Sequence, residues 1–369
     1  MTWEQRKFSE ILKSHSFRAY LTEPRDAGNY EVIQQGDNPV VGYSDGEPFE
    51  KFEDVTLFGD HTVSLYKPTE PFFVATDGVK ILSGDGFDGK YLFSLLERYK
   101  PESQGYKRHF TILKNKNVWF TKHKNEQHEI GVFFSNLDNL ITLHQRKLEA
   151  LENLKKTLLS KMFPKNGRAV PELRFAGFTD NWEQRKLGEV SERVSGNDGR
   201  MELPTLTISA GMGWLDQRER FSGNKAGKEQ KNYTLLSENE LSYNRGNSKL
   251  AKYGVVFKLS THKEALVPRI YHSFRTTKEA DPDYIEYMFA TRLPNRELGK
   301  LVTSGARMDG LLNINYDDFI GIKIKIPSLA EQSEIGMLFI QLDKLITLHQ
   351  RKIEQYQELK KTLLSKMFI

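Results

Sequence analysis

Two stretches of the chain concentrate side chains that bind phosphate groups. Lys107 to Lys124 contains six cations and no acid, and Arg245 to Lys278 contains eight cations and one acid, Glu264. Stretches of this kind favour contact with nucleic-acid phosphates, which supply affinity without sequence choice. The candidate contacts within them are Lys107, Arg108, His109, Lys114, Lys116, Lys249, Arg269 and Arg275.

Sequence choice on DNA requires forked side chains that pair with base edges, and Arg, Asn and Gln have that geometry. Two loops supply such groups: the segment 243–248, which follows an expected strand, and the glycine-bracketed segment 305–310. For any single residue of these loops a solvated surface position is the simpler interpretation, whereas the set as a whole favours DNA contact. The candidates are Asn244, Arg245, Asn247 and Arg307.

Two segments resemble enzyme motifs without completing them. The segment 223–229 has one residue too few between its glycines for a phosphate-binding loop, and Glu stands in place of Ser or Thr. The Asp-Pro-Asp-Tyr segment 281–284 lacks the second Pro of the Asp-Pro-Pro-Tyr motif of amino-methyltransferases. Asp281 as a helix N-cap followed by Pro282 explains it better. We find no metal-ligand spacing and no nuclease pattern, so the sequence predicts a non-catalytic chain.

The composition is that of a two-domain globular protein with a mild preference for polyanions. The chain has 369 residues, 38% of them hydrophobic and 28% charged, no cysteine, and a formal net charge of +5. The lack of cysteine excludes disulfides and thiolate metal sites. No apolar run approaches the ~20 residues that span a bilayer, and the N-terminus lacks the apolar core of a signal peptide. We therefore expect a cytoplasmic protein with no membrane partner.

A long helix is predicted twice, at an offset of 205 residues. The sequence Leu-Asp-x-Leu-Ile-Thr-Leu-His-Gln-Arg-Lys begins at Leu137 and at Leu342, and a shorter echo, Trp-Glu-Gln-Arg-Lys, begins at Trp3 and Trp182. Between these matched ends the halves look unrelated. Apolar residues follow a seven-residue repeat, which predicts a coiled-coil seam. The seam positions are Phe134, Leu137, Ile141, His144, Leu148, Leu151, Leu158 and Met162, then Phe339, Leu342, Ile346, His349, Ile353, Tyr356, Leu363 and Met367.

We expect the two helix copies to pair with each other. The alternative is two independent helices, each packed on its own domain, but near identity over the whole helix favours a shared partner surface. His144 and His349 are interpreted as packed or polar seam residues rather than metal ligands or catalysts. Lys155 and Lys360 are expected to extend their charges out of the seam and help to fix its register.

The regions between the repeats contain short apolar runs broken by Gly, Asp and Pro, which are typical of short strands. The predicted fold class is α+β: two small strand-rich domains separated by two long antiparallel helices that form an intramolecular coiled coil, with a pseudo-two-fold repeat. The expected strands are 55–58, 62–66, 72–75, 79–82, 203–208, 241–244, 255–259 and 321–326, and the expected shorter helices are 91–99 and 283–291. The predicted boundaries are 1–125 (first domain), 126–164 (first helix), 165–181 (linker), 182–330 (second domain) and 331–369 (second helix).

In these features the chain resembles the specificity subunit of type I restriction-modification systems. The resemblance covers nearly the whole length and rests chiefly on both helix copies and on the Trp-Glu-Gln-Arg-Lys-Leu-Gly-Glu segment at Trp182. Other segments that carry it are the leader 171–178 and the helix entry 327–332, with 71–78 and 106–110 resembling one target-recognition type and 305–312 another.

The resemblance implies two target-recognition domains that each read one half of a split, asymmetric site in double-stranded DNA, with the helices setting the unread spacer. Two modification subunits, which carry S-adenosylmethionine, would dock on the helices and domains. Restriction subunits, which hydrolyse ATP and need Mg²⁺, would then join them, so no cofactor is expected in this chain.

Two other hypotheses remain open at this point. A non-specific DNA-binding or coiled-coil scaffold protein would show no preference between DNA sequences. A self-contained methyltransferase or nuclease would be active as the purified chain. One departure from the internal repeat concerns the first domain: the leader 171–178 has no counterpart before Trp3. We therefore expect that domain to be tied less firmly to the end of the second helix.

Overall fold

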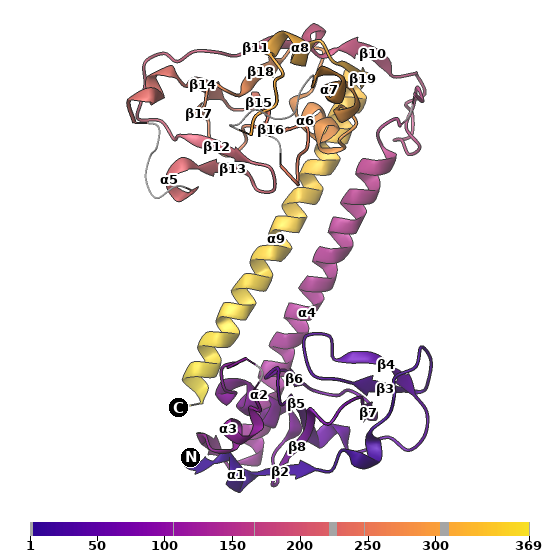
Figure 1. Cartoon of the computed structure of the whole chain (residues 1–369), viewed down its shortest axis with the longest axis vertical. Helices are drawn as coiled ribbons and strands as arrows, with labels where there is room; N and C mark the ends of the chain where they lie inside the picture. The colour runs from indigo at the N-terminus through magenta and orange to yellow at the C-terminus, as the bar shows by residue number, and fades with distance from the viewer. Residues whose placement is uncertain are drawn as a thin grey trace. The chain divides into compact units, whose positions relative to one another are not determined.

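The computed structural model describes residues 3–105, 107–165, 167–220, 227–246, 248–302 and 310–368. The chain divides into two compact units, of which unit 1 comprises residues 1–147 and 349–369 and unit 2 comprises residues 148–348. Each unit contains one strand-rich domain and a segment of each of two long helices, α4 (Lys124–Lys161) and α9 (Leu329–Met367) (Figure 1). Among the described residues, no helix is long and apolar enough to cross a membrane.

Unit 1 builds its domain from three small sheets. Their strand orders are β1-β9, β2-β8-β5-β6 and β4-β3-β7. The strands are β1 (Trp3–Lys7), β2 (Leu12–His15), β3 (Tyr30–Ile33), β4 (Val40–Ser44), β5 (Val55–Gly59), β6 (Leu65–Tyr66), β7 (Phe72–Val74), β8 (Val79–Gly84) and β9 (Asn117–Thr121). The helices are α1 (Phe8–Ile11), α2 (Gly89–Tyr99) and α3 (Phe110–Lys114), with 3-10 turns at Arg18–Tyr20 and Phe52–Asp54.

Unit 2 has sheets in the orders β10-β19, β11-β18-β15-β16, β12-β13 and β14-β17. The strands are β10 (Glu183–Lys186), β11 (Ser191–Arg193), β12 (Leu206–Ser209), β13 (Gly213–Asp216), β14 (Thr234–Ser237), β15 (Leu241–Asn244), β16 (Val255–Lys258), β17 (Glu264–Val267), β18 (His272–Thr276) and β19 (Lys323–Ile326). The helices are α5 (Gln217–Arg220), α6 (Pro282–Ala290), α7 (Asn295–Leu301) and α8 (Tyr316–Ile320), with 3-10 turns at Leu187–Glu189 and Gly227–Asn232.

The two domains share a topology that their sequences do not reveal. In unit 1, the strand after β1 is β2, and it pairs with β8 in the sheet order β2-β8-β5-β6. In unit 2, the strand after β10 is β11, and it pairs with β18 in the corresponding order β11-β18-β15-β16. A parallel pairing also recurs, between β3 and β7 and at the bridge from Thr205 to Leu266. The apparent lack of relation between the two centres is therefore a property of the sequences and not of the fold.

In both units, the repeated Trp-Glu-Gln-Arg-Lys segment pairs with the strand that leads into the repeated long helix. Strand β1, which opens at Trp3, pairs antiparallel with β9, and the chain then enters α4. Strand β10 pairs antiparallel with β19, after which the chain enters α9. The repeated pieces thus form one framework, a two-stranded ladder leading into a long helix.

An aromatic cluster holds the end of α9 against the domain of unit 1. Phe368 is 0% exposed, and its ring centroid lies 5.9 Å from Trp3, 5.6 Å from Tyr91 and 6.2 Å from Phe134. Tyr91 belongs to α2 and Phe134 to α4, so a single ring joins two helices to the opening strand. Burial of such rings is the largest apolar gain that one side chain can supply.

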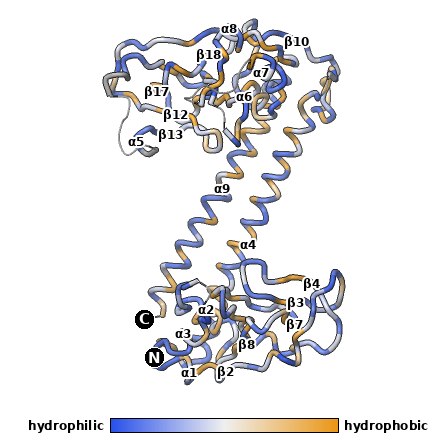
Figure 2. Tube along the Cα trace, viewed as in Figure 1, coloured by the Kyte–Doolittle hydropathy of each residue, from blue (hydrophilic) through white to orange (hydrophobic). Residues whose placement is uncertain are grey.

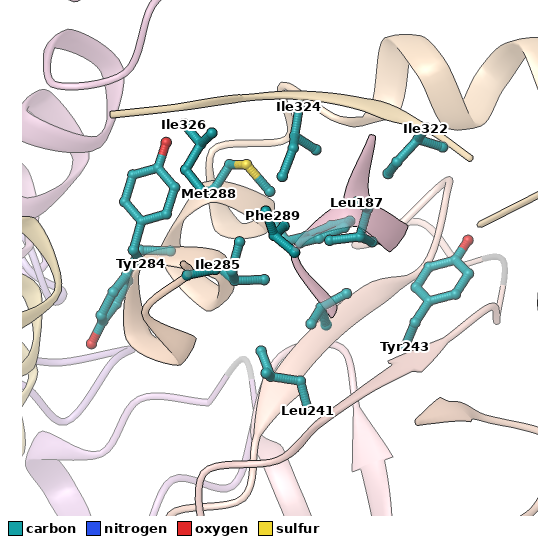
Figure 3. Close-up of a cluster of buried hydrophobic side chains, with 14 of the residues drawn as sticks. Leu187, Leu241, Tyr243, Tyr284, Ile285, Met288, Phe289, Ile322, Ile324 and Ile326 are labelled. Atoms are coloured by element: carbon teal, nitrogen blue, oxygen red, sulfur yellow. The ribbon is translucent and has the colours of Figure 1, made fainter. Parts of the chain in front are cut away.

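The same cluster recurs in unit 2 around the end of α4. The ring centroid of Phe163 lies 6.1 Å from Trp182, 5.6 Å from Tyr284 and 6.2 Å from Phe339. Because the distances and ring sets of the two units match, the expected weaker attachment of the first domain is wrong for this cluster. Figure 3 shows the apolar core behind it, in which side chains of β15, α6 and β19 interleave.

Backbone contacts tie α2 to the start of α4 in unit 1. Asp88 caps α2 by accepting hydrogen bonds from the backbone of Lys90 and Tyr91, and its own N–H donates to Gln127 Oε1 at 3.1 Å. The Gln127 amide donates to the Thr121 carbonyl at 2.6 Å. A Cβ on Gly131 would lie 2.6 Å from the Tyr91 nitrogen, so only glycine allows this approach.

Unit 2 repeats these contacts, although its α6 differs in sequence from α2. Asp281 caps α6, with Pro282 in the first turn as predicted, and its N–H donates to Gln332 Oε1 at 2.9 Å. The Gln332 amide donates to the Pro327 carbonyl at 2.9 Å. A Cβ on Gly336 would lie 2.9 Å from Asp283 Cβ. The internal repeat therefore includes an Asp-capped helix that sequence comparison alone did not detect.

The segments of α4 and α9 within each unit pair antiparallel, and every predicted seam position is buried or half-buried. Lys360 binds Asp138 at 2.6 Å in unit 1, and Lys155 binds Asp343 at 2.5 Å in unit 2. Each lysine therefore meets the aspartate of the other helix copy. Hydrophobic and hydrophilic residues alternate along both helices in Figure 2, as expected for helices with one buried face.

A histidine pair lies in the seam of unit 1. His144 Nδ1 and His349 Nδ1 are 2.7 Å apart, and the Tyr356 ring stacks on His144 at a centroid distance of 5.6 Å. Such a contact needs one donor and one acceptor nitrogen, so at least one ring is neutral. Desolvation by burial lowers the pKa of His144 below its ordinary value, and the charges of His349, Lys147 and Lys352 act in the same direction.

Replacing Phe368 with Ala should destabilise unit 1 by about 3–5 kcal/mol, because it leaves a cavity among three packed rings. Urea unfolding of the purified chain, with hydrogen exchange to localise the change, measures this. Leu359→Ala is the control, since Leu359 is 44% exposed on the same helix and surface substitutions cost about 0.5 kcal/mol or less. Equal losses for the two variants would contradict the role of the cluster.

The histidine pair should make unit 1 less stable in acid. Because the pKa of His144 is lowered in the folded state, the unfolded chain takes up the proton first as pH falls below the ordinary His value of about 6.5. Stability from the pair is thus present above that pH and lost below it. Urea midpoints between pH 5 and 8 for the wild type and for His144→Leu/His349→Leu measure this. Burial raises the pKa of Glu286 to about 7, and titration of Glu286 affects the wild type and the variant alike. The difference between the two pH profiles therefore reports the histidine pair alone. Parallel pH profiles would refute it.

Candidate nucleic-acid interface

The basic stretch of unit 1 is held at its start by a buried carboxylate. Asp60 Oδ1 accepts a hydrogen bond from the Phe110 backbone at 2.8 Å, at the first residue of α3. His109 is 0% exposed, with Nδ1 3.0 Å from the Asp60 carbonyl and Nε2 accepting from the Gln104 backbone at 2.9 Å. These partners define a neutral ring with hydrogen on Nδ1. The prediction that His109 contacts DNA is wrong, because the ring is sealed inside the domain.

The cations next to His109 are on the surface. Lys107 and Arg108 are exposed immediately before α3, and Lys114 is exposed at its end with Nζ 5.2 Å from the Phe110 ring centre. Lys116 is half-buried, and its Nζ is 3.5 Å from the Lys100 carbonyl. Burial of the intervening His109 therefore fixes the backbone from which the flanking cations project.

Arg108 also lines a hollow of about 540 Å³ in unit 1. Lys80 lies in the same hollow, with Nζ 2.7 Å from the Asp77 carbonyl and 3.8 Å from Asp60 Oδ2. Hydroxyls and an imidazole also line it, from Ser14, His15, Ser16 and Thr111, together with the Asp60 carboxylate and the rings of Phe17 and Phe110. Burial of the His15 ring lowers its pKa, and the charges of Lys13 and Lys51 act in the same direction. Cations beside hydroxyl donors suit a DNA phosphate. Sequence reasoning missed Lys80, which lies far from the basic stretch along the chain.

In unit 2, the predicted strand-to-loop exit is found at the end of β15, but its polar side chains are engaged within the chain. Asn244 accepts from the Gly246 backbone at 3.0 Å and donates to the Ile208 carbonyl at 3.2 Å. Arg245 donates to the carbonyls of Leu312 at 3.4 Å and Ile314 at 3.2 Å. Both side chains thus position loops, and base contact by them stays a prediction.

The other candidates of unit 2 differ in availability. Lys249 and Arg269 are exposed. Arg275 is exposed as well, but its Nη2 lies 2.9 Å from Glu192, which offers it a competing partner to phosphate. Asn247 and Arg307 lie outside the described residues, as do most of the 305–310 loop and residues 223–226 of the loop resembling a phosphate-binding motif.

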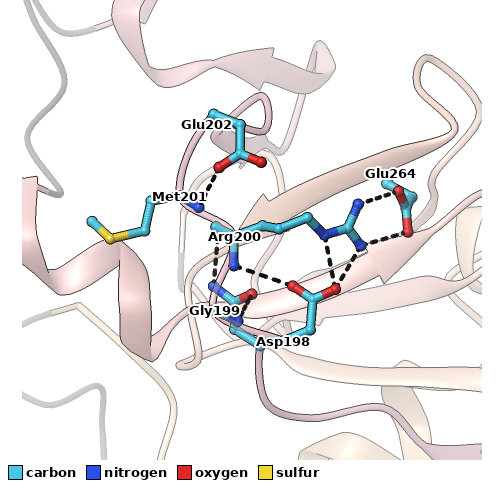
Figure 4. A network of polar contacts seen from close by, with 7 residues as sticks. Asp198, Gly199, Arg200, Met201, Glu202 and Glu264 are labelled. Carbon is cyan, nitrogen blue, oxygen red and sulfur yellow. Dashed lines mark hydrogen bonds and ion pairs between the residues drawn. The ribbon is translucent and has the colours of Figure 1, made fainter.

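The lone acid of the second basic stretch is neutralised by a residue from outside it. Arg200 donates to both oxygens of Glu264, at 2.7 and 2.9 Å, and also binds Asp198 (Figure 4). These hydrogen bonds lower the pKa of Glu264 and raise that of Arg200. The exposed cations of this stretch therefore meet no free carboxylate from the stretch itself, whereas Lys258 is buried and paired with Asp283. The exposed cations are Lys249, Lys252, Lys263, Arg269, Arg275 and Lys278. Within the described part of the chain, no group of three or more His, Asp and Glu residues could hold a metal ion.

The architecture of the two units, a duplicated α+β domain with paired long helices, is that of a known class of proteins. Over 100% of this chain and 96% of the other, the fold matches the crystal structure of the type I restriction-modification system S subunit from M. genitalium, with a TM-score of 0.66 and 15% sequence identity. The HsdS subunit from Thermoanaerobacter tengcongensis aligns over 99% of this chain and 96% of its own, at 15% identity and a TM-score of 0.43. The match to the M. genitalium structure shows that this chain shares its fold, and the predicted fold class is confirmed.

The sequence comparisons agree with the fold. Residues 1–153 match the family model described as the type I restriction modification DNA specificity domain. A curated relative, the type I restriction enzyme MjaVIII specificity subunit of Methanocaldococcus jannaschii, is 22% identical over 256 residues, which cover 65% of this chain and 58% of that protein. Residues 1–153 thus match the type I restriction modification DNA specificity domain, and the resemblance seen in the sequence is confirmed.

Replacing Lys107 and Arg108 together with Ala should weaken binding to random duplex DNA and flatten its salt dependence. Each lost phosphate contact reduces the slope of log K against log salt by about 0.9, so the double variant should lose about 2 units of slope. Fluorescence anisotropy over a salt series measures it. Arg275→Ala is the matched control, with little expected change because Glu192 already pairs with that cation. An unchanged slope in the double variant would exclude both residues as phosphate contacts.

Proposed function

We propose that this chain is the sequence-specific DNA-binding subunit of a type I restriction-modification complex, and that it recognises a split, asymmetric site in double-stranded DNA. One observation carries the proposal most directly. The two units share a matching framework of ladder, capped helix and aromatic cluster, yet the loops that their domains present differ in sequence. A repeated frame with two different surfaces is what recognition of two unlike half-sites requires.

Each domain would combine phosphate anchoring with base reading. In unit 1 the anchoring groups are Lys107, Arg108 and the hollow that contains Lys80. In unit 2 they are Lys249 and Arg269, on a stretch whose own acid is already neutralised. Phosphate contacts hold the protein in register, and loop side chains beside them then select bases. The paired helices would set the length of the unread spacer between the half-sites.

An exposed apolar surface supports docking of two copies of one partner. In unit 1, Leu140, Leu143 and Leu359 are exposed, and in unit 2 their repeat equivalents are exposed as well. Those equivalents are Leu345, Leu348 and Leu154. Several apolar residues that remain exposed on one helix pair suit contact with a partner protein. Because both units carry the same set, the partners would be two identical modification subunits, to which restriction subunits would add.

Catalysis in this proposal belongs to the partners. The modification subunits would bind S-adenosylmethionine, and the restriction subunits would bind ATP and Mg²⁺, while this chain directs both to the site. The role assigned to this chain is therefore binding and orientation, performed by its cations and loops.

Base-modification sequencing of DNA from cells that express this chain with its modification subunit tests the proposal. The expected result is methylation at a motif with two short defined halves around a fixed unread spacer. Cells that express the modification subunit alone are the control and should lack that motif. Methylation with only one defined half would show that one unit does not read DNA. An assembled complex that leaves no sequence-specific methylation would favour the scaffold alternative.

A further inference from the structure

Two side chains of unit 2 are more exposed than any other large apolar residue among the described residues. Met212 is 74% exposed and Leu250 is 63% exposed. Single exposed apolar residues are common on protein surfaces and need no explanation. They come from loops that are distant in the sequence. The two loops approach each other, since a Cβ added at Gly211, next to Met212, would lie 3.3 Å from Leu250 Cδ1.

The loop that carries Met212 is a tight hairpin between β12 and β13, which lie side by side in Figure 1. Ser209 pairs with Gly213, so the turn contains only three residues, and Gly213 has a φ of +72°. Three-residue hairpins commonly end on a residue in this left-handed region. The backbone of the turn is thus fixed and presents Met212 outward.

The loop that carries Leu250 is held equally firmly. Ser248 and Ala251 exchange two backbone hydrogen bonds of 3.1 Å around it. Arg292, from the end of α6, donates to the Leu250 carbonyl at 3.2 Å. Both apolar side chains are therefore displayed by ordered turns.

Cations lie on both sides of Leu250 along its loop, and Arg292 contacts the loop backbone. Lys249, Lys252 and Arg292 are exposed, and the stretch 241–258 contains no acidic residue. A docking site for another protein would need a wider apolar area than two side chains supply. An apolar centre with a cationic rim instead matches duplex DNA, in which phosphates flank a groove whose floor carries the bases.

We infer that Met212 and Leu250 form an apolar reading tip that contacts a thymine methyl group in the major groove. This inference rests on the proposed function and assigns the tip to the half-site read by unit 2. Thymine is the only base whose major-groove edge presents a methyl group, so an apolar side chain there selects it without hydrogen bonds. The neighbouring lysines hold the flanking phosphates and set the depth of the tip.

Substitution of deoxyuridine for thymine tests the tip, because uracil lacks only the methyl group. Once the methylated motif is known, each thymine of both half-sites is replaced in turn, and affinity is measured with the complex of this chain and its modification subunit. The wild type should lose about three- to fourfold in affinity at one or two thymines of a single half-site, as expected for one methyl contact. Thymines of the other half-site should show no effect.

The variant Met212→Ser/Leu250→Ser should bind the thymine site more weakly and should no longer distinguish uracil at the affected positions. Met201→Ser is the control, since Met201 is also exposed in unit 2 but lies beside the Arg200 network. It should keep the uracil effect of the wild type.

Several results would overturn the inference. These are a wild-type complex indifferent to uracil, a unit 2 half-site without thymine, and a double variant that retains uracil sensitivity. A double variant that no longer assembles with the modification subunit would assign the tip to a protein interface instead. A wild-type complex that binds all DNA sequences alike would overturn the proposed function itself, whereas discrimination without a uracil effect overturns only the tip.

Discussion

The structure depends on the insertion of one phenylalanine, at the end of a long helix, among the aromatic rings of a domain. In each unit this ring contacts the tryptophan of the opening segment, the tyrosine of an Asp-capped helix and a phenylalanine of the other long helix. Aromatic pairs add about 0.5–1.5 kcal/mol each beyond the area they bury. The glutamine and glycine at the helix start then fix the angle at which the domain meets the helix.

Much of this fold follows from the sequence, because the features that predict it are local. The seven-residue repeat locates both long helices and their seams, and Asp281 with Pro282 marks the start of α6. Alternation and turn residues locate β15 and β8 closely. The shared topology of the two domains is not local, since pairing of β11 with β18 or of β2 with β8 joins segments far apart along the chain. Strands of three to five residues carry too little pattern to reveal their partners. The signal that could have exposed the hidden repeat is the Asp-x-x-Tyr spacing, shared by Asp88 with Tyr91 and by Asp281 with Tyr284.

The candidate interface was predictable in composition but not in detail. Counting cations found both basic stretches, but a count cannot distinguish a free cation from one that is engaged. His109 is buried and forms hydrogen bonds with the backbone of Asp60 and Gln104. The Arg245 guanidinium donates to carbonyls of a segment that is distant in the sequence. Glu264 is the converse case. The sequence shows an acid among the cations of this stretch, but in the structure Arg200 binds its carboxylate. The sequence does not single out Lys80 or Met212, because the residues near them in the structure are distant along the chain.

The swapped ion pairs of the seam have an evolutionary consequence. Asp138 and Lys155 lie on one helix copy, and their equivalents Asp343 and Lys360 lie on the other, so that each copy contributes one member to each pair. A half-length ancestor with one domain and one helix would already have carried both members of every seam contact. Two such chains could have associated as a symmetric homodimer through isologous contacts. Duplication and fusion of its gene would then have allowed the two domains to diverge, because one symmetric surface would have become two independently inherited ones.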